Sequence, residues 1–244
     1  MRFRVLLTAT IVVVVVAAVL HRISGIGFAL IAMPMLIVLQ GPVAGLQLGL
    51  VLGLFVSMIA LATSWRALNW RTALLLSAPA LVTVPLGAWL SSLISPPALI
   101  IFIGTSLVLL LALTIAVKPS EPVRASLPLT FTGGALAGLV HVMSGLSAPV
   151  LTAYAIRTRW PQPAFVATAQ VVFIVLNAAS LITYQTRLSE LRAGSLLLPA
   201  LAVGVFTGAW LSHGVTPTVA RRLSIAIALI AASVTIVKGI SGLD

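Results

Sequence analysis

The feature that most constrains this chain is a long apolar run without charge. Between Thr72 and Val117 there is no Asp, Glu, Lys or Arg. A helix of roughly 20 apolar residues crosses the hydrocarbon core of a bilayer, so the run can cross twice, with Ser95-Pro96-Pro97 at the turn. Only 7% of the whole chain is charged, which is too little to cover the surface of a water-soluble domain. The sequence therefore predicts an all-α, polytopic membrane helical bundle.

The few charged residues are strongly biased towards the basic type. Fourteen Lys and Arg against three Asp and Glu give a net charge of +11. The basic residues lie mostly in short connections beside apolar segments, which indicates cytoplasmic loops and anionic lipid headgroups as neighbours, not nucleic acid. The chain has no Cys, so a disulfide framework and thiolate metal sites are excluded, and we expect no cofactor. The expected partners are the lipid bilayer and a small solute; a homo-oligomer stays an open alternative.

Several short motifs occur twice at a nearly constant spacing. His21-Arg22-Ile23-Ser24-Gly25 returns as His141-Val142-Met143-Ser144-Gly145, 120 positions later, and Pro79 returns as Pro199. Gly87-Ala88-Trp89-Leu90-Ser91 returns one residue further on, as 208–212. One shared spacing across half a chain indicates duplication, which in an apolar protein is typical of transporters built from two related halves. We predict a single transmembrane transporter domain, 1–244, with homologous repeats at about 5–117 and 126–237.

Each repeat begins with an apolar stretch that must be interrupted. Val5–Leu39 has 35 residues, about 52 Å as one helix. Its two parts, Val5–Leu20 and Ile26–Leu39, are each shorter than an ordinary span. The interruptions fall at Ser24–Gly27 and Ser144–Pro149, where Gly and Pro allow a helix to unwind if protein or water satisfies the backbone. We expect broken or re-entrant first helices in both repeats.

The two repeats can be inverted or parallel, and the charges leave both arrangements open. Inverted repeats divide Lys and Arg nine to five between the two sides of the membrane; parallel repeats divide them nine to four and leave Arg22 within the membrane. The excess length of Val5–Leu39 favours a fold-back and hence inverted repeats. Both termini are then expected on the periplasmic side.

The interruptions are the main candidates for a binding site. A broken helix leaves unpaired N–H groups at the start of its second part, and these groups, with the positive end of the helix dipole, attract an anion. Hydroxyl and small side chains fit such a site; the alternative is that they only permit close helix packing. The candidate substrate-binding residues here are Ser24, Gly25, Gly27, Ser144, Gly145 and Ser147.

Four further polar residues complete the candidate set. His21 and His141 precede the two breaks, and Arg22 accompanies only the first. An ionisable residue within a membrane is a functional candidate by default, although each of these could also lie at the headgroup boundary. Asn177 and Ser57 lie 120 positions apart, and each could line a pathway or form an interhelical hydrogen bond. We add His21, Arg22, His141 and Asn177 to the candidate binding residues.

The apolar segments contain no Asp or Glu, because the three acidic residues are Glu121, Glu190 and Asp244. Carboxylate-based proton relays and cation sites are therefore excluded, and His21 and His141 are the candidate proton carriers. An anion needs no buried carboxylate, so the sequence favours a secondary transporter for a small anion. The alternatives are a non-catalytic membrane assembly or accessory protein and a membrane-embedded enzyme. We expect no enzymatic activity, since acid–base chemistry would need a carboxylate cluster.

Three motifs follow the pattern of a known family. They are a Gly-rich break followed by a proline (Gly25-Ile26-Gly27-Phe28-Ala29, then Met33-Pro34), the loop Leu68-Asn69-Trp70-Arg71, and the doubled Gly-Ala-Trp-Leu segment. The chain resembles the sulfite exporter TauE/SafE family of bacterial permeases over nearly its whole length. The resemblance implies a multi-pass protein of the bacterial inner membrane that carries sulfite, organosulfonates or related sulfur-containing or carboxylate anions. Leu188-Ser189-Glu190-Leu191, the second-half counterpart of the loop, lacks the Trp.

Overall fold

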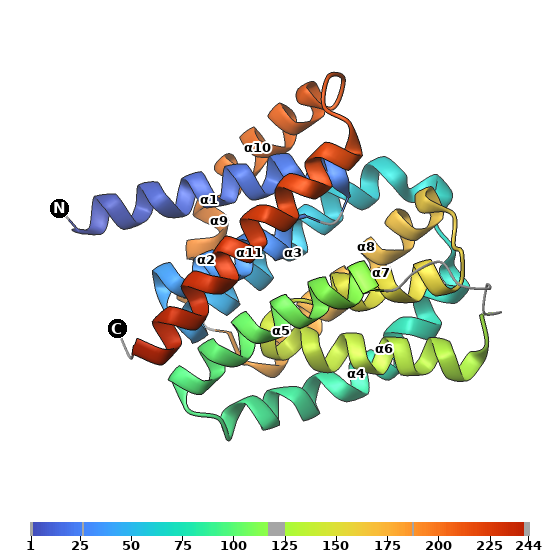
Figure 1. Cartoon of the computed structure of the whole chain (residues 1–244), viewed down its shortest axis with the longest axis horizontal. Coiled ribbons are helices and arrows are strands. Elements are labelled where there is room, and N and C mark those ends of the chain that lie inside the picture. Colours follow the sequence, from blue (N-terminus) through green and yellow to red (C-terminus); the bar gives the residue numbers. More distant parts are fainter. Residues whose placement is uncertain (1, 26, 117–124, 187, 242–244) are drawn as a thin grey trace.

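The computed structural model describes residues 2–25, 27–116, 125–186 and 188–241, and these residues form helices and connections without a strand (Figure 1). The helices are α1 (Arg2–Ser24), α2 (Phe28–Gln40), α3 (Pro42–Ser64), η1 (Trp65–Ala67), α4 (Trp70–Ser92), α5 (Pro96–Ala116), α6 (Leu127–Ser144), α7 (Ala148–Arg157), α8 (Gln162–Thr183), α9 (Leu188–Leu196), α10 (Leu198–Leu211) and α11 (Pro217–Ser241). Six of them are long and apolar enough to cross a membrane. The predicted all-α membrane bundle is confirmed.

The chain reverses at the first predicted break. The N–H of Phe28 donates to Nδ1 of His21 at 3.4 Å, and at the far end of α2 the Gln40 amide donates to the Thr10 hydroxyl at 3.1 Å. Helix α2 therefore returns alongside α1. Gly25 makes the reversal possible, because its φ of +83° lies in the left-handed region that residues with a Cβ avoid.

The second break has the same backbone geometry. Gly145 has a φ of +75°, and its N–H donates to the carbonyl of His141 at 2.6 Å, as Gly25 donates to His21 at 2.7 Å. The Tyr154 hydroxyl on α7 lies 2.9 Å from the Thr130 hydroxyl near the start of α6, so α7 returns alongside α6. A glycine in the left-handed conformation thus ends the first helix of each half.

The predicted helix lengths are wrong in two places. α1 and α6 do not stop before the histidines: Arg4–Ser24 and Leu127–Ser144 are each long enough to cross a membrane. Ser24 and Ser144 are accommodated inside the helix because their hydroxyls bond back to carbonyls four residues earlier. Further along the second half, residues 193–211 do not form one straight helix but divide into α9 and α10, which meet at 40°. Pro199 in the first turn of α10 explains the bend, because proline cannot continue the preceding helix.

The two halves run in opposite directions. Helix α1 begins, and α11 ends, at one end of the bundle, which we call the terminal end (Figure 1). Helices α1, α3 and α5 run away from it, with α2 and α4 returning. The backbone of Gly134 lies against Leu76 and that of Gly138 against Ala80, so α6 runs parallel to α4, towards the terminal end. Helix α6 thus has the opposite sense to α1. Which end faces the cytoplasm and the common origin of the halves stay predictions.

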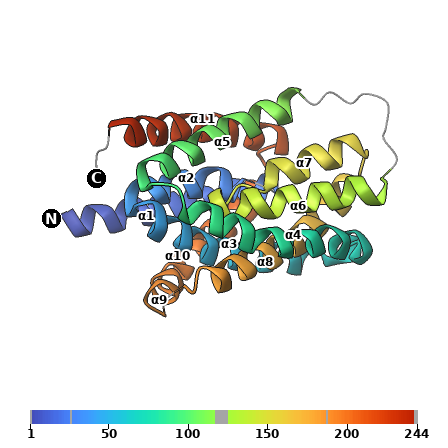
Figure 2. The same ribbon diagram turned by 90° about the horizontal axis from the view of Figure 1, so that it is seen from below.

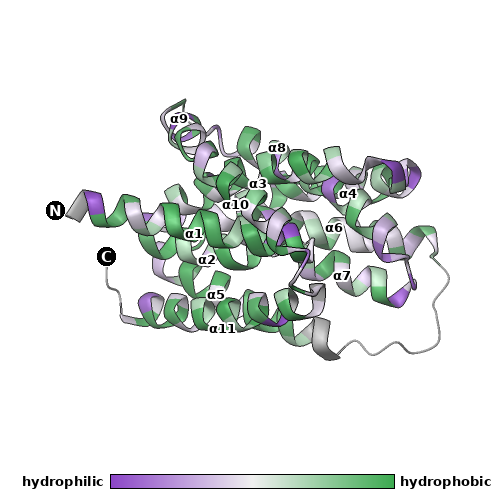
Figure 3. Cartoon of the chain, turned by 90° about the horizontal axis from the view of Figure 1, so that it is seen from above, coloured by the Kyte–Doolittle hydropathy of each residue, from purple (hydrophilic) through white to green (hydrophobic). Residues whose placement is uncertain are grey.

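Apolar side chains cover the outside of the bundle along most of its length. In Figure 3 the hydrophobic colour runs over the lengths of the helices, and the hydrophilic colour gathers near their ends. Large exposed side chains include Trp89, Phe206 and Trp210. Such a surface suits hydrocarbon as solvent. Helices α5 and α11 form an outer row on one side (Figure 2), and α3 and α8 are the most buried of the six long helices.

Candidate functional site

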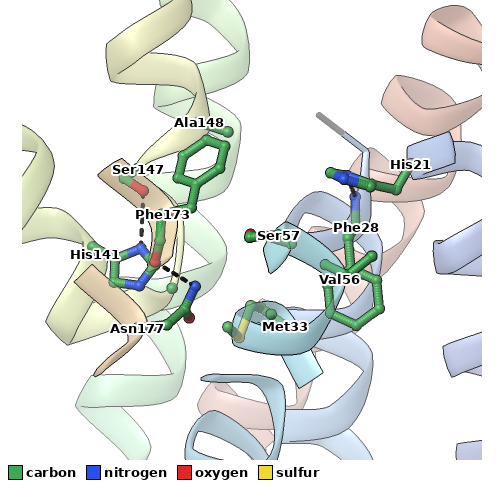
Figure 4. A pocket seen from close by; sticks show the side chains of 13 residues that line it. His21, Phe28, Met33, Val56, Ser57, His141, Ser147, Ala148, Phe173 and Asn177 are labelled. Atoms are coloured by element: carbon green, nitrogen blue, oxygen red, sulfur yellow. Dashed lines mark hydrogen bonds between the residues drawn. The ribbon is translucent and has the colours of Figure 1, made fainter. Parts of the chain in front are cut away.

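The two breaks meet at one cavity inside the bundle (Figure 4). Helices α1 and α2 border it from one side, α6 and α7 from the other, and α3 and α8 pass between. Its polar lining residues are His21, Ser57, His141, Ser147 and Asn177, and its apolar walls include Phe28, Met33, Val56 and Phe173. The two histidines are 120 positions apart in the sequence, as are Ser57 and Asn177. Positions that correspond to one another under the predicted repeat therefore face a common space.

The first histidine has a defined hydrogen-bonding role. Nδ1 of His21 accepts the hydrogen bond from the N–H of Phe28, so a neutral His21 carries its proton on Nε2. That Nε2 is buried and has no partner in the described part of the chain. Because buried donors are normally paired, this N–H is available to a solute in the cavity.

The second histidine differs in its partner. Nδ1 of His141 lies 2.9 Å from the Ser147 hydroxyl, which can donate or accept. Its Nε2 also lacks a partner among the described residues, as does Oδ1 of the adjoining Asn177, whose amide nitrogen donates to the carbonyl of Phe173 at 2.7 Å. Three unpaired polar atoms therefore belong to residues that line one small space.

The cavity also receives the starts of two helices. Phe28 begins α2 and Ala148 begins α7, and both residues line the cavity. The positive ends of both helix dipoles thus lie at the same place, which favours a negative ligand. The lining contains no Asp or Glu, and no cluster of three His, Asp or Glu within the described ranges could hold a metal ion. The site is electrostatically suited to an anion.

In this conformation the cavity is small. Its volume is about 30 Å³. One water needs roughly 10–15 Å³ of such space, so the cavity accepts two or three waters. A larger solute can enter only if the side chains that wall the cavity move apart.

The sequence matches the model of a known protein family. The model of the family "Sulfite exporter TauE/SafE" matches residues 10–235, most of the chain. The chain belongs to the sulfite exporter TauE/SafE family. It is therefore a multi-pass membrane transporter, and the resemblance seen in its motifs is confirmed. Neither a curated protein nor a solved structure matches it.

A vestibule lies beside the TauE/SafE transporter's cavity, towards the end opposite the termini. This space of about 280 Å³ is bordered by Arg22, Ser24 and Gly25 of the first break, and by Thr63 and Ser64 at the end of α3. His21 and Val56 line both the vestibule and the central cavity, so their side chains form the wall between the two spaces.

A second vestibule, of about 550 Å³, lies towards the terminal end. Its lining repeats that of the first at the spacing of 120: Gln162, Val166, Thr63, Ser64 and Val205 in the first space correspond to Pro42, Leu46, Thr183, Tyr184 and Pro85 in the second. The second vestibule shares no lining residue with the central cavity. The structure is thus asymmetric about its centre.

Tyr184, which lines the second vestibule, makes contacts that the first vestibule lacks. Its hydroxyl donates to the carbonyl of Val142, next to His141, at 2.8 Å and lies 3.2 Å from the Ser91 hydroxyl. These contacts join the ends of α8 and α4 to α6 beside the second break. The first-half counterpart is Ser64, whose shorter side chain bonds only to the carbonyl of Ala60 on its own helix. Tyr184 thus ties three helices together beside the second break, whereas the Ser64 hydroxyl is bonded within its own helix.

The predicted site residues divide into three groups. His21, His141, Gly145, Ser147 and Asn177 line the central cavity, and Arg22, Ser24 and Gly25 line the first vestibule.

Gly27 and Ser144 border neither space. A Cβ on Gly27 would lie 3.0 Å from the Ser224 hydroxyl oxygen, and Ser144 is fully buried with its hydroxyl bonded to its own helix. The packing alternative describes these two positions better than a binding role.

Gln170 is a contributor that the sequence prediction did not include. Its side-chain amide on α8 donates to the carbonyl of Gly25 at 3.2 Å, and it thus satisfies a backbone group that the first break leaves unpaired. The available signal was an amide within an otherwise apolar segment. Nothing local to the break identifies it, because the two residues are 145 positions apart.

Proposed function

We propose that this protein is a secondary transporter for a small oxyanion, sulfite or an organosulfonate, and that the central cavity is its binding site. The observation that carries the proposal is the pair of unpartnered histidine Nε2 atoms where two helix starts meet and no carboxylate is present. Small carboxylates are the related substrate class, because they present the same negative oxygens.

The chemistry of the lining supports an oxyanion. Ser57, His21 and His141 offer donors from different helices, and oxygens that point in several directions can each accept one. These donors are neutral when the histidines are neutral, which favours binding that can be reversed during transport. The apolar walls lower the local dielectric and so strengthen each hydrogen bond.

The arrangement of the vestibules supports alternating access. In this conformation the first vestibule reaches His21 from the end opposite the termini, and Tyr184 closes the other side. Because the halves run in opposite directions, exchanging their conformations would close the first path and open the second. Transport then requires the Tyr184 contacts to break in each cycle.

The basic residues support an orientation in the membrane. Arg66, Arg71, Arg157, Arg159 and Arg222 lie in connections or helix ends opposite the termini, whereas Arg4, Arg192 and Lys238 belong to the terminal end. By the positive-inside rule the opposite end faces the cytoplasm and the termini face the periplasm of a bacterial inner membrane. The first vestibule would then be open to the cytoplasm.

Flux measurements test the proposal. The purified protein in liposomes should transport sulfite, methanesulfonate or acetate down a gradient, and should not transport Na⁺. Gly145→Leu should abolish flux, because a side chain there meets Met33 and distorts the break. Val12→Leu, on the exposed face of α1, should transport normally. A folded wild-type protein that moves none of the three anions would contradict the proposal and favour an accessory role.

A further inference from the structure

The two histidines of the cavity differ in what their Nδ1 atoms face. At His21 the partner is a backbone N–H, which can only donate. At His141 the partner is the hydroxyl of Ser147, which can turn to donate or to accept. The difference follows from the sequence: Ser147 corresponds at the repeat spacing to Gly27, which has no hydroxyl.

A second proton on His21 is disfavoured by this geometry. With protons on both ring nitrogens, its Nδ1–H would point at the N–H of Phe28, and the hydrogen bond that joins α1 to α2 would be lost. Arg22, a permanent positive charge, is adjacent to His21 in the sequence. His21 therefore stays a neutral Nε2–H donor.

His141 meets no such obstacle. When it takes a second proton, the Ser147 hydroxyl turns so that its oxygen accepts from Nδ1–H, and Nε2–H remains free to donate to an anion in the cavity. The hydroxyl partner thus serves both protonation states of the imidazole.

The surroundings of His141 hold no fixed counter-charge. Among the described residues, α5 and α8 carry no charged side chain, and α4 and α7 carry only Arg71 and Arg157 near their ends. His21 lies across the cavity, and Arg22 borders the first vestibule. Tyr154 and Tyr184 are bonded elsewhere, to Thr130 and to Val142. An imidazolium here has its best counter-charge in a bound anion, and the anion has its best counter-charge in the imidazolium.

We infer that one proton accompanies each transported anion, with His141 as the proton carrier and Ser147 as its reversible hydrogen-bond partner. The inference rests on the proposed transport function. Water in the open vestibule supplies the proton to His141 as the anion binds; the pair crosses, and the proton returns to water on the other side when the anion leaves. For a monovalent anion, the complex that crosses adds no net charge to the protein.

Proton and anion movement can be measured together in liposomes that contain a trapped pH indicator. Methanesulfonate is a suitable probe, because its acid is too strong to carry a proton across the membrane by itself. Wild-type uptake should acidify the lumen by about one proton per methanesulfonate and should be insensitive to membrane potential. His141→Gln should still pass the anion, more slowly and with potential sensitivity, while acidification per anion falls at least about tenfold. His21→Gln should slow uptake but keep the proton ratio.

Further variants keep the test independent of one substitution. Ser147→Ala removes the hydroxyl and should lower the proton ratio, and Ser147→Thr should restore it. His213→Gln and Ser233→Ala are matched controls at exposed positions. Methanesulfonate uptake without acidification in the wild type would overturn the inference and leave the proposed function intact. So would a normal proton ratio in both His141→Gln and Ser147→Ala. Absence of flux for all three anions would instead overturn the proposed function.

Discussion

The two helix breaks share one backbone geometry and have different surroundings. Both place a glycine at positive φ after a histidine, and both donate the glycine N–H to the carbonyl of that histidine. The first break borders a vestibule, and a Cβ on Gly25 would come within 3.2 Å of Val166. The second is enclosed, and a Cβ on Gly145 would come within 2.6 Å of Met33. The same motif therefore borders a vestibule in one half and packs tightly against Met33 of α2 in the other.

This difference indicates how an inverted pair can work. If the halves exchange roles during transport, the asymmetry belongs to one conformation of the protein and not to its sequence alone. Tyr184 and its counterpart Ser64 differ in size, so part of the asymmetry between the two sides of the cavity comes from the sequence itself. Substitutions at Asn177, at the two glycines and at Tyr184 separate the two contributions.

The largest effect is expected at Asn177, the counterpart of Ser57. Asn177→Asp places a carboxylate in the cavity, and two like charges 4 Å apart repel by about 4 kcal/mol at an effective dielectric of about 20. Anion flux in liposomes should fall by more than about a hundredfold. Asn177→Ser, which copies the first half, should keep most of the flux. Equal flux in both variants would mean that the anion does not pass Asn177.

The two glycines should respond unequally to alanine. A left-handed conformation costs a residue with a Cβ about 1–2 kcal/mol at both sites, but only Gly145→Ala also collides with Met33. Flux should fall about tenfold or more in Gly145→Ala and only a few-fold in Gly25→Ala. Adding Met33→Ala should bring Gly145→Ala close to Gly25→Ala. Gly133→Ala, whose Cβ has ordinary contacts, is the control. Equal losses at both sites, unchanged by Met33→Ala, would remove packing as the source of the asymmetry.

The third effect is expected at the closed path. Tyr184→Phe removes the hydroxyl that holds Val142 and Ser91, and one net hydrogen bond of about 1 kcal/mol corresponds to about a fivefold shift towards the open state. The label site is Val142→Cys, which is buried in the closed state. Its reaction with a thiol reagent from the terminal end should be about fivefold faster in the Tyr184→Phe background. Tyr154→Phe should not change the rate. An unchanged rate in Tyr184→Phe would show that Tyr184 does not hold the path closed.

The smallest effect is expected at Gln170. Gln170→Leu copies its counterpart Leu50 and leaves the Gly25 carbonyl without this donor, at a cost of about 1 kcal/mol in the free energy of unfolding. Flux should fall only about twofold, since the loss lies beside the first vestibule and outside the central cavity. The loss of stability is measured by the thermal unfolding temperature of Gln170→Leu, compared with that of the control Thr132→Val on an exposed face. A Gln170→Leu protein as stable as the wild type would show that the first break needs no partner from α8.

Sequence reasoning reached much of the fold for identifiable reasons. Uncharged stretches such as Thr72–Val117 have no stable place outside a membrane, and only helices satisfy their backbone there. The helix boundaries around Ser24 and Ser144 were missed because serine can bond back within a helix. The division of α9 from α10 was not predicted, because whether Pro199 bends or ends a helix depends on how the neighbouring helices pack.

Part of the site could be predicted from the same paired motifs that indicated the repeats. Paired motifs identified both histidines and both glycines, and the structure brings the histidines to one cavity. The sequence could not show how deep in the bundle each residue lies. It also could not show which side chains of other helices contact it. Met33 against Gly145, Tyr184 against Val142 and Gln170 against Gly25 are all contacts between distant segments.

Protection of a single cysteine tests most directly that the anion binds between the two breaks. The natural chain has no Cys, so Ser57→Cys in the cavity and Thr63→Cys in the first vestibule can each be labelled alone. Methanesulfonate should slow the labelling of Ser57→Cys, with half-protection at the concentration that half-saturates flux, and should leave the labelling of Thr63→Cys nearly unchanged. Labelling of Ser57→Cys at the same rate with and without saturating methanesulfonate, in protein that still transports it, would contradict a binding site in this cavity.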